Sequence, residues 1–188
     1  MFCLGSPASR SPPSPGEEGG SGGKVGTTTV LSPPPSPLTR VLSYSSPSHV
    51  DRSHALLHSV PPDLLKMSNS LMKSLNLSGN RLRTLPNSFY NLRRLKKLNL
   101  SENELVRLSS ELELFTLLEE LDLSRNILSE IPENIKYLYN LRSLDLSFNP
   151  LTSLPSGLVL LSFLTTLSLN NTQLQDLPED LGLLQVRT

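Results

Sequence analysis

The sequence has one cysteine, Cys3, no tryptophan, and few other aromatic residues. A single cysteine cannot form an intramolecular disulfide, so we expect a protein of a reducing compartment, in the cytoplasm. The 17 basic and 17 acidic residues balance, so the chain lacks the positive charge typical of nucleic-acid binding. The scarcity of aromatic residues also disfavours a surface on which bases stack.

Long apolar runs and catalytic motifs are also missing. No run approaches the ~18 apolar residues of a membrane-spanning helix, and no secretory signal follows Met1. The three histidines, His49, His54 and His58, have no cysteine or carboxylate at metal-ligand spacing. There is no phosphate-binding glycine loop and no nucleophile elbow. We therefore expect no catalytic residues, no metal, no cofactor and no small-molecule substrate.

Residues 1–48 differ in composition from the rest of the chain, because serine, proline and glycine fill more than half of the positions. Too few apolar side chains are present to offset the entropy of ordering, so we expect a disordered tail. Six Ser-Pro pairs make this tail a plausible substrate for proline-directed kinases, at Ser6, Ser11, Ser14, Ser32, Ser36 and Ser46. A simple tether and a regulated tail both remain open.

Residues 72–186 repeat every 23 residues, five times, without insertion or deletion. The first unit begins Met72-Lys-Ser-Leu-Asn-Leu-Ser-Gly-Asn-Arg-Leu82, and apolar residues recur at positions one, four, six, eleven, fourteen, eighteen and twenty-one. The pattern LxxLxLxxNxL resembles the leucine-rich repeat and predicts an α/β solenoid, a horseshoe with a parallel concave sheet. Residues 50–71 are interpreted as an N-terminal cap or degenerate repeat, and residues 187–188 as the truncated start of a sixth repeat.

Position nine of the repeat is asparagine in four units and Thr172 in the fifth. In a stacked array these side chains are predicted to form a ladder that hydrogen-bonds the backbone of the turns, at Asn80, Asn103, Asn126 and Asn149. Position fifteen is proline except in the second unit, where Ser109 stands. This proline sets the direction of the chain after the strand.

The side chains at positions three, five and seven are expected to point away from the core, onto the concave face. Charges of alternating sign at positions two and three predict neutralising pairs between neighbouring strands. Asp122 beside Asp145 is different, because adjacent like charges favour a cationic partner. The candidate partner-binding residues are Lys97, Asn99, Glu120, Asp122, Arg142, Asp145 and Phe148. A basic peptide across the middle units and a merely solvated face both remain open.

Residues outside the repeat consensus resemble the LAP family, which joins leucine-rich repeats to PDZ domains and includes Scribble-, erbin-, densin- and Lano-like proteins. The resemblance lies in His49–Leu64, Ser124–Tyr137, Asn149–Gly157 and Leu167–Gly182. It implies a non-catalytic scaffold of cell polarity and junctions. Such a scaffold binds proteins through the concave face and associates peripherally with the membrane at the cell cortex or basolateral junctions. Some members are palmitoylated ahead of the cap, which makes Cys3 a candidate lipidation site.

Two other functions remain open. The array is also compatible with a generic intracellular leucine-rich repeat adaptor of Ras-type signalling. It is equally compatible with the regulatory fragment of a larger phosphatase or kinase.

Overall fold

The computed structural model describes residues 48–67, 71–175 and 182. Residues 1–47 of the tail predicted over 1–48, with Cys3, lie outside the described residues. So do most of the end of the fifth repeat and the predicted start of a sixth at 187–188. All of the described residues belong to one compact unit, Ser43–Thr188.

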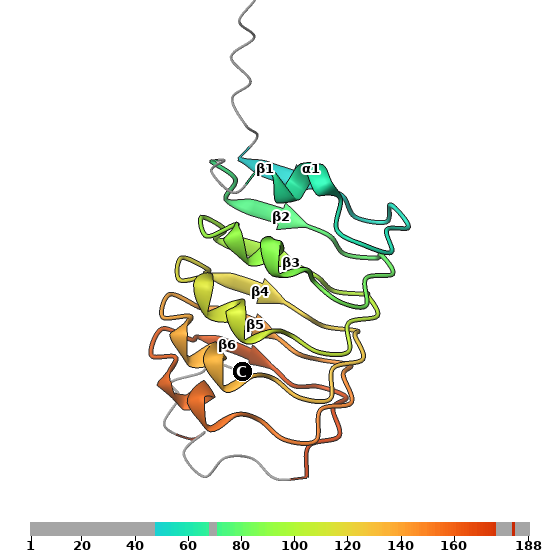
Figure 1. Ribbon diagram of the computed structural model, residues 1–188. Helices are drawn as coiled ribbons and strands as arrows, with labels where there is room; N and C mark the ends of the chain where they lie inside the picture. The colour runs from blue at the N-terminus through green and yellow to red at the C-terminus, as the bar shows by residue number, and fades with distance from the viewer. Residues whose placement is uncertain (1–47, 68–70, 176–181, 183–188) are drawn as a thin grey trace, which may run out of the picture. The chain divides into compact units, whose positions relative to one another are not determined.

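Six short parallel strands form one sheet in the order of the sequence (Figure 1). Each strand lies in register with the next, so Leu98 pairs with Leu121 and Leu121 with Leu144. The sheet is not closed, which confirms the predicted leucine-rich repeat solenoid. The strands are β1 (His49–Asp51), β2 (Ser74–Asn76), β3 (Lys97–Asn99), β4 (Glu120–Asp122), β5 (Ser143–Asp145) and β6 (Thr166–Ser168).

A short helical turn follows each of the first five strands and covers one face of the sheet (Figure 1). The first is α-helical, and the others are 3₁₀ turns of five residues each, a geometry that is common in such short pieces. The prolines of position fifteen, Pro86, Pro132 and Pro155, stand at the N-caps of three of these turns. The turns are α1 (Pro62–Leu65), η2 (Asn87–Asn91), η3 (Ser110–Leu114), η4 (Glu133–Tyr137) and η5 (Ser156–Leu160).

The hydrophobic core lies between the sheet and the helical turns. In the four units from 72 to 163, every one of the seven apolar repeat positions is buried. Phe89, Tyr90 and Phe115 pack against one another with ring centroids 5.5–5.9 Å apart. Since a single unit cannot bury its own leucines, this core exists only through the stacking of neighbours.

The entry segment is part of the same stack. β1 pairs in register with β2, so His49 lies beside Ser74. The strand begins at His49, one residue before the predicted start of the cap at residue 50. Val50, Val60 and Leu64 are buried in the common core. The sheet therefore gains a sixth strand from residues that carry little of the repeat consensus.

The residue at position eight has a left-handed backbone in every unit. Gly79 has φ +65°, and side chains of other types occupy the same conformation at Glu102, Arg125, Phe148 and Asn171. At Gly79 the ring of the exposed His54 lies 2.2 Å from where a Cβ would stand, so a side chain here would have to displace that ring as well as adopt a left-handed φ. A bulky residue such as Phe148 is strained here.

Candidate partner-binding face

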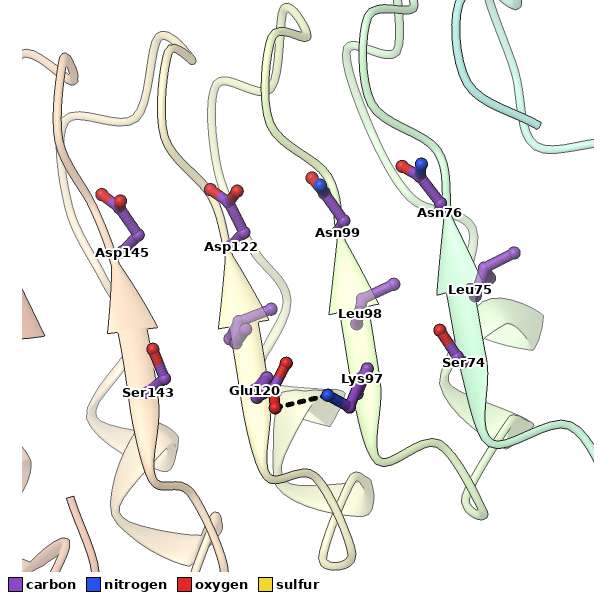
Figure 2. Close-up of a pocket in the computed structure, with 11 residues that line it drawn as sticks. Ser74, Leu75, Asn76, Lys97, Leu98, Asn99, Glu120, Asp122, Ser143 and Asp145 are labelled. Atoms are coloured by element: carbon purple, nitrogen blue, oxygen red, sulfur yellow. Dashed lines mark hydrogen bonds and ion pairs between the residues drawn. The ribbon is translucent and has the colours of Figure 1, made fainter. Parts of the chain in front are cut away.

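The face of the sheet opposite the helical turns is polar and open; we call it the open sheet face, and it corresponds to the predicted concave face. It contains a depression of about 430 Å³ over strands β2 to β5. Figure 2 shows two rows of polar side chains across it, one from the first residues of the strands and one from their last residues. The lining residues are Ser74, Leu75, Asn76, Lys97, Leu98, Asn99, Glu120, Leu121, Asp122, Ser143 and Asp145.

Five of the seven candidate residues lie together in this depression. They are Lys97, Asn99, Glu120, Asp122 and Asp145. The other two lie beside it: Arg142 is exposed just before β5, and Phe148 lies in the turn after β5. The candidate site is thus a polar floor with a cation and an aromatic ring at opposite ends of the same strand.

Two lysine–glutamate pairs neutralise one side of this face. Lys97 Nζ lies 2.6 Å from Glu120 Oε1, across strands β3 and β4 (Figure 2). The neighbouring pair, Lys96 and Glu119, is also hydrogen-bonded. The hydrogen bond from Lys96 lowers the pKa of Glu119 below its usual value, with a smaller electrostatic contribution from Arg142. Because both pairs are exposed to solvent, they contribute little to the stability of the fold.

The residues at position five have a structural role that the sequence interpretation missed. The Oδ1 atom of Asp122 accepts hydrogen bonds from the Ser124 N–H at 3.0 Å and the Ser124 hydroxyl at 2.7 Å. Asp145 Oδ1 accepts the Ser147 N–H at 2.9 Å in the same way. Asparagine or aspartate followed two residues later by serine is the sequence signal of such an Asx turn.

These turns occupy only one oxygen of each carboxylate. Asp122 and Asp145 are register partners on adjacent strands, and neither forms an ion pair with any described residue. Figure 2 shows both side chains at the same end of their strands. The floor of the depression therefore presents two neighbouring acidic groups whose charge is not compensated within the described part of the chain.

Phe148 lies at the edge of this acidic pair with an exposed ring. The Arg125 guanidinium stacks on it, 4.3 Å from the ring centroid, and Arg125 also lies 3.8 Å from Glu102. Arg125, Glu102 and Phe148 all occupy position eight of successive units. The ring is held by a strained backbone and one cation, which keeps an apolar group in contact with solvent.

The position-nine asparagines join the units at the same end of the strands. Asn126 Nδ2 donates to the carbonyl oxygens of Leu123 and, in the preceding unit, Leu100, at 3.0 and 2.9 Å. Its Oδ1 accepts the N–H of Leu105 at 3.0 Å. The same pattern recurs at Asn103 and Asn149, while Asn80 serves the entry segment. The ladder fixes the turns that carry Phe148 and the Asx turns.

Thr172 takes the asparagine position in the last described unit. Its hydroxyl donates to the Leu169 carbonyl at 2.9 Å, which reproduces one of the asparagine bonds. No described residue accepts the N–H of Leu151, whose counterparts Leu82, Leu105 and Leu128 bond to an asparagine. The ladder therefore ends at Asn149.

No group of three or more histidine, cysteine or acidic residues within the described ranges could hold a metal ion. In the same part of the chain, no helix has the length and apolarity needed to cross a bilayer.

Stacked parallel strands, leucines buried at fixed spacing and an asparagine ladder together define a leucine-rich repeat protein. Comparison with protein families agrees: models of the leucine-rich repeat match residues 49–105, 117–138 and 140–161. The chain contains leucine-rich repeat domains. This repeat typically serves as a non-catalytic protein-interaction module, and no catalytic family is indicated. No curated protein matches the chain.

Solved structures with the same fold come from bacteria and plants. A leucine-rich repeat protein of Leptospira interrogans is 28% identical, with a TM-score of 0.68, over 77% of this chain and 43% of that one. The ectodomain of the Arabidopsis thaliana receptor kinase GASSHO1/SCHENGEN3, in complex with CASPARIAN STRIP INTEGRITY FACTOR 2, is 40% identical, with a TM-score of 0.56. That match covers 62% of this chain and 14% of the ectodomain.

The plant peptide hormone receptor RGFR1, in complex with RGF2, is 32% identical, with a TM-score of 0.62, over 69% of this chain and 22% of the receptor. The chain thus spans less than half the length of each of these structures. Two of the three are complexes with a peptide or protein factor, which fits the general role of leucine-rich repeats in binding other proteins.

Proposed function

We propose that this protein is a non-catalytic scaffold that binds a segment of a partner protein on its open sheet face. The observation that supports this most directly is the pair Asp122 and Asp145, side by side on adjacent strands and without an ion-pair partner among the described residues. A cation from a partner would relieve their mutual repulsion. The structural neighbours bound to peptide factors provide a precedent for ligand binding by this fold.

The face also specifies how such a segment would lie. The in-register strands, at ~4.8 Å spacing, fit a chain that crosses them in an extended conformation. Its basic residue would meet Asp122 and Asp145, and an apolar residue would contact the Phe148 ring beyond the ends of the strands. The Lys97–Glu120 pair would border the same segment on the other side.

The cellular role that we propose is that of a cell-polarity and junction scaffold at the plasma-membrane cortex. Support comes from the resemblance of the non-consensus residues to the LAP family, above all the entry segment and the Thr172 unit. Both are structural peculiarities of this chain: the entry segment adds β1 to the sheet, and Thr172 ends the asparagine ladder. Cytoplasmic location and peripheral membrane association are parts of the same proposal.

Proximity labelling in polarised epithelial cells tests both parts. We expect the full chain to label cortical and junctional proteins, and we expect Asp122→Ser/Asp145→Ser to lose most of that labelling. Glu130→Ser is the matched control, because Glu130 is an exposed carboxylate that does not line the depression. Cortical neighbours that are still labelled by the double variant would exclude the open sheet face as the surface that binds them. A neighbour set without cortical proteins would instead exclude the polarity role.

A further inference from the structure

A second surface, away from the open sheet face, carries exposed apolar side chains. Leu117, Tyr139 and Phe163 are 45%, 55% and 55% exposed, and Tyr137 and Leu160 are exposed beside them. Singly scattered apolar residues are normal on a protein surface, but a group of five in neighbouring units marks an interaction site. We call these five residues the lateral strip.

The lateral strip follows the repeat. All five residues lie at positions twenty to twenty-three, where the chain leaves a helical turn and enters the next strand. Figure 1 shows these connections stacked at one edge of the sheet, beside the starts of the strands. The buried residues of the same segments, such as Leu138 and Leu161, already fill the core. Packing of the repeat therefore does not require Tyr139 or Phe163 to be apolar.

Contacts between neighbouring residues hold the strip in place. The rings of Tyr137 and Tyr139 meet edge to face, with centroids 6.1 Å apart. Asn140 Nδ2 donates to the Thr116 carbonyl of the preceding unit at 2.7 Å, which ties the loop of Tyr139 to the loop of Leu117. A partner that docks here would not have to order these loops, so less binding energy would be lost to entropy.

One end of the strip is basic. Arg93 and Arg94 occupy the same connection one unit before Leu117, both are exposed, and neither forms an ion pair with a described residue. A third cation, Lys136, lies further along the strip, 5.3 Å from the Tyr137 ring centroid. The surface is therefore apolar over three units and positively charged where it begins.

We propose that the lateral strip binds an amphipathic segment of a partner protein, with apolar residues along one face and carboxylates at one end. Three unit steps of ~4.8 Å separate Arg94 from Phe163, which is roughly 15 Å, or about ten residues of α-helix. The apolar face covers Leu117, Tyr139 and Phe163, and the carboxylates pair with Arg93 and Arg94.

A second copy of this chain fits the strip less well. Two-fold pairing would place Arg93 and Arg94 of one copy against the Phe163 end of the other. The polar neighbours there, Ser162 and Thr165, carry no negative charge. The charge pattern therefore favours a different protein that supplies the acidic groups.

Selection from a random dodecapeptide phage library on the full chain tests this proposal. We expect peptides that combine apolar residues with acidic residues at one end. The selected peptides should bind at least ~10-fold more weakly to Tyr139→Ser/Phe163→Ser, which removes two anchors from the interface. Val106→Ser/Ile127→Ser is the matched control, because these residues are 48% and 51% exposed but lie outside the strip. It should bind the peptides as the wild type does.

Charge reversal provides the second arm. Selection on Arg93→Glu/Arg94→Glu should yield peptides with basic ends, whereas Asp122→Ser/Asp145→Ser should leave the original peptides bound. The second result separates this surface from the open sheet face, so either proposal can fail alone.

Several outcomes would overturn the proposal. They are peptides that bind the Tyr139→Ser/Phe163→Ser variant equally well, a set of peptides without acidic residues, and a dimer in sedimentation that the same variant dissociates. Binding of the wild type, but not of this variant, to phosphatidylcholine–phosphatidylserine vesicles would assign the strip to a lipid surface instead. Circular dichroism of each variant verifies that it is folded.

Discussion

The hydroxyl of Tyr90 accepts the backbone N–H of Ser109 across two neighbouring units, at 3.2 Å. Ser109 occupies the position that is proline in the other units, and proline has no N–H to satisfy. The ring of Tyr90 is buried between Phe89 and Phe115, and burial raises the pKa of its hydroxyl. The tyrosine of one unit thus provides the hydrogen-bond acceptor for the backbone N–H that the next unit has because serine replaces proline there.

This pairing predicts a double-mutant cycle. Tyr90→Phe should lower the free energy of unfolding by ~1–3 kcal/mol, because it leaves the Ser109 N–H without a partner. Ser109→Pro removes that N–H, and the φ of −80° at Ser109 lies within the range of proline. The variant with both changes should therefore recover most of the loss, as chemical denaturation would measure. Additive effects of the two substitutions would show that the hydrogen bond is not what couples these residues.

The asparagine ladder predicts that substitution of Asn126 lowers the stability of the fold. Asn126→Ala should destabilise the fold by about 2–4 kcal/mol, because the buried N–H of Leu105 and the carbonyls of Leu100 and Leu123 lose their partner. Asn91→Ala is the control, since Asn91 is exposed and its replacement should change stability by less than ~0.5 kcal/mol. Equal melting curves for Asn126→Ala and the control would refute the structural role.

Thr172→Asn should act in the other direction. An asparagine at this position can accept the Leu151 N–H, which has no partner among the described residues, and should stabilise the fold by ~1 kcal/mol. Hydrogen exchange at the Leu151 amide measures the bond directly. Unchanged exchange in the variant would mean that the fifth unit cannot adopt the geometry of the others.

The Lys96–Glu119 pair predicts a dependence on pH. Hydrogen bonding from Lys96 lowers the pKa of Glu119 below its ordinary value of 4.5, so the pair stabilises the fold above that value. The contribution is lost as the pH falls through the lowered pKa of the folded state. NMR titration should show that Lys96→Met raises the pKa of Glu119 towards 4.5. The free energy of unfolding of the variant should then fall less than that of the wild type as the pH is lowered. If the pKa of Glu119 is the same in Lys96→Met as in the wild type, another group must be what lowers it.

Phe148→Gly separates stability from binding. Glycine relieves the left-handed strain of ~1–2 kcal/mol but adds freedom to the unfolded chain, so we expect a net gain of up to ~1 kcal/mol. The same substitution removes the apolar contact at the edge of the open sheet face and should weaken partner labelling. Gly79→Ala is the opposite test at the equivalent position: it should destabilise the fold, because alanine is strained at φ +65° and the His54 ring must move away from the new Cβ. A less stable Phe148→Gly variant would show that the ring serves packing.

The repeat period predicted the fold well because it depends on local physics. Leucines at positions four and six alternate as strand residues must, so the sequence alone indicates β2 to β6 and the burial of Leu98 and Leu121. The rows of side chains on the open sheet face follow from the same period. The partner of Ser109 could not be predicted, because Tyr90 looks like an ordinary surface position of the preceding unit.

Other features were hidden because their residues contradict local preference. Gly79 and Asn171 suggest a left-handed position eight, but Glu102, Arg125 and Phe148 do not, so only the stack reveals the rule. Tyr139 and Phe163 lie outside the consensus and seem unrelated in the sequence. They become neighbours because every unit has the same length.

The ladder bonds give the solenoid a direction. Each asparagine oxygen accepts an N–H from the unit before it, as Asn149 does from Leu128. Loss of a later unit therefore strands a backbone N–H inside the core of the earlier one. Of the ladder bonds, loss of an earlier unit breaks only those made by a side-chain amide of the later unit, which can turn to water. As far as the ladder is concerned, loss of units from the carboxyl side should therefore destabilise the remaining unit more than loss from the amino side. The units are alike in structure, but they do not stabilise their two neighbours equally.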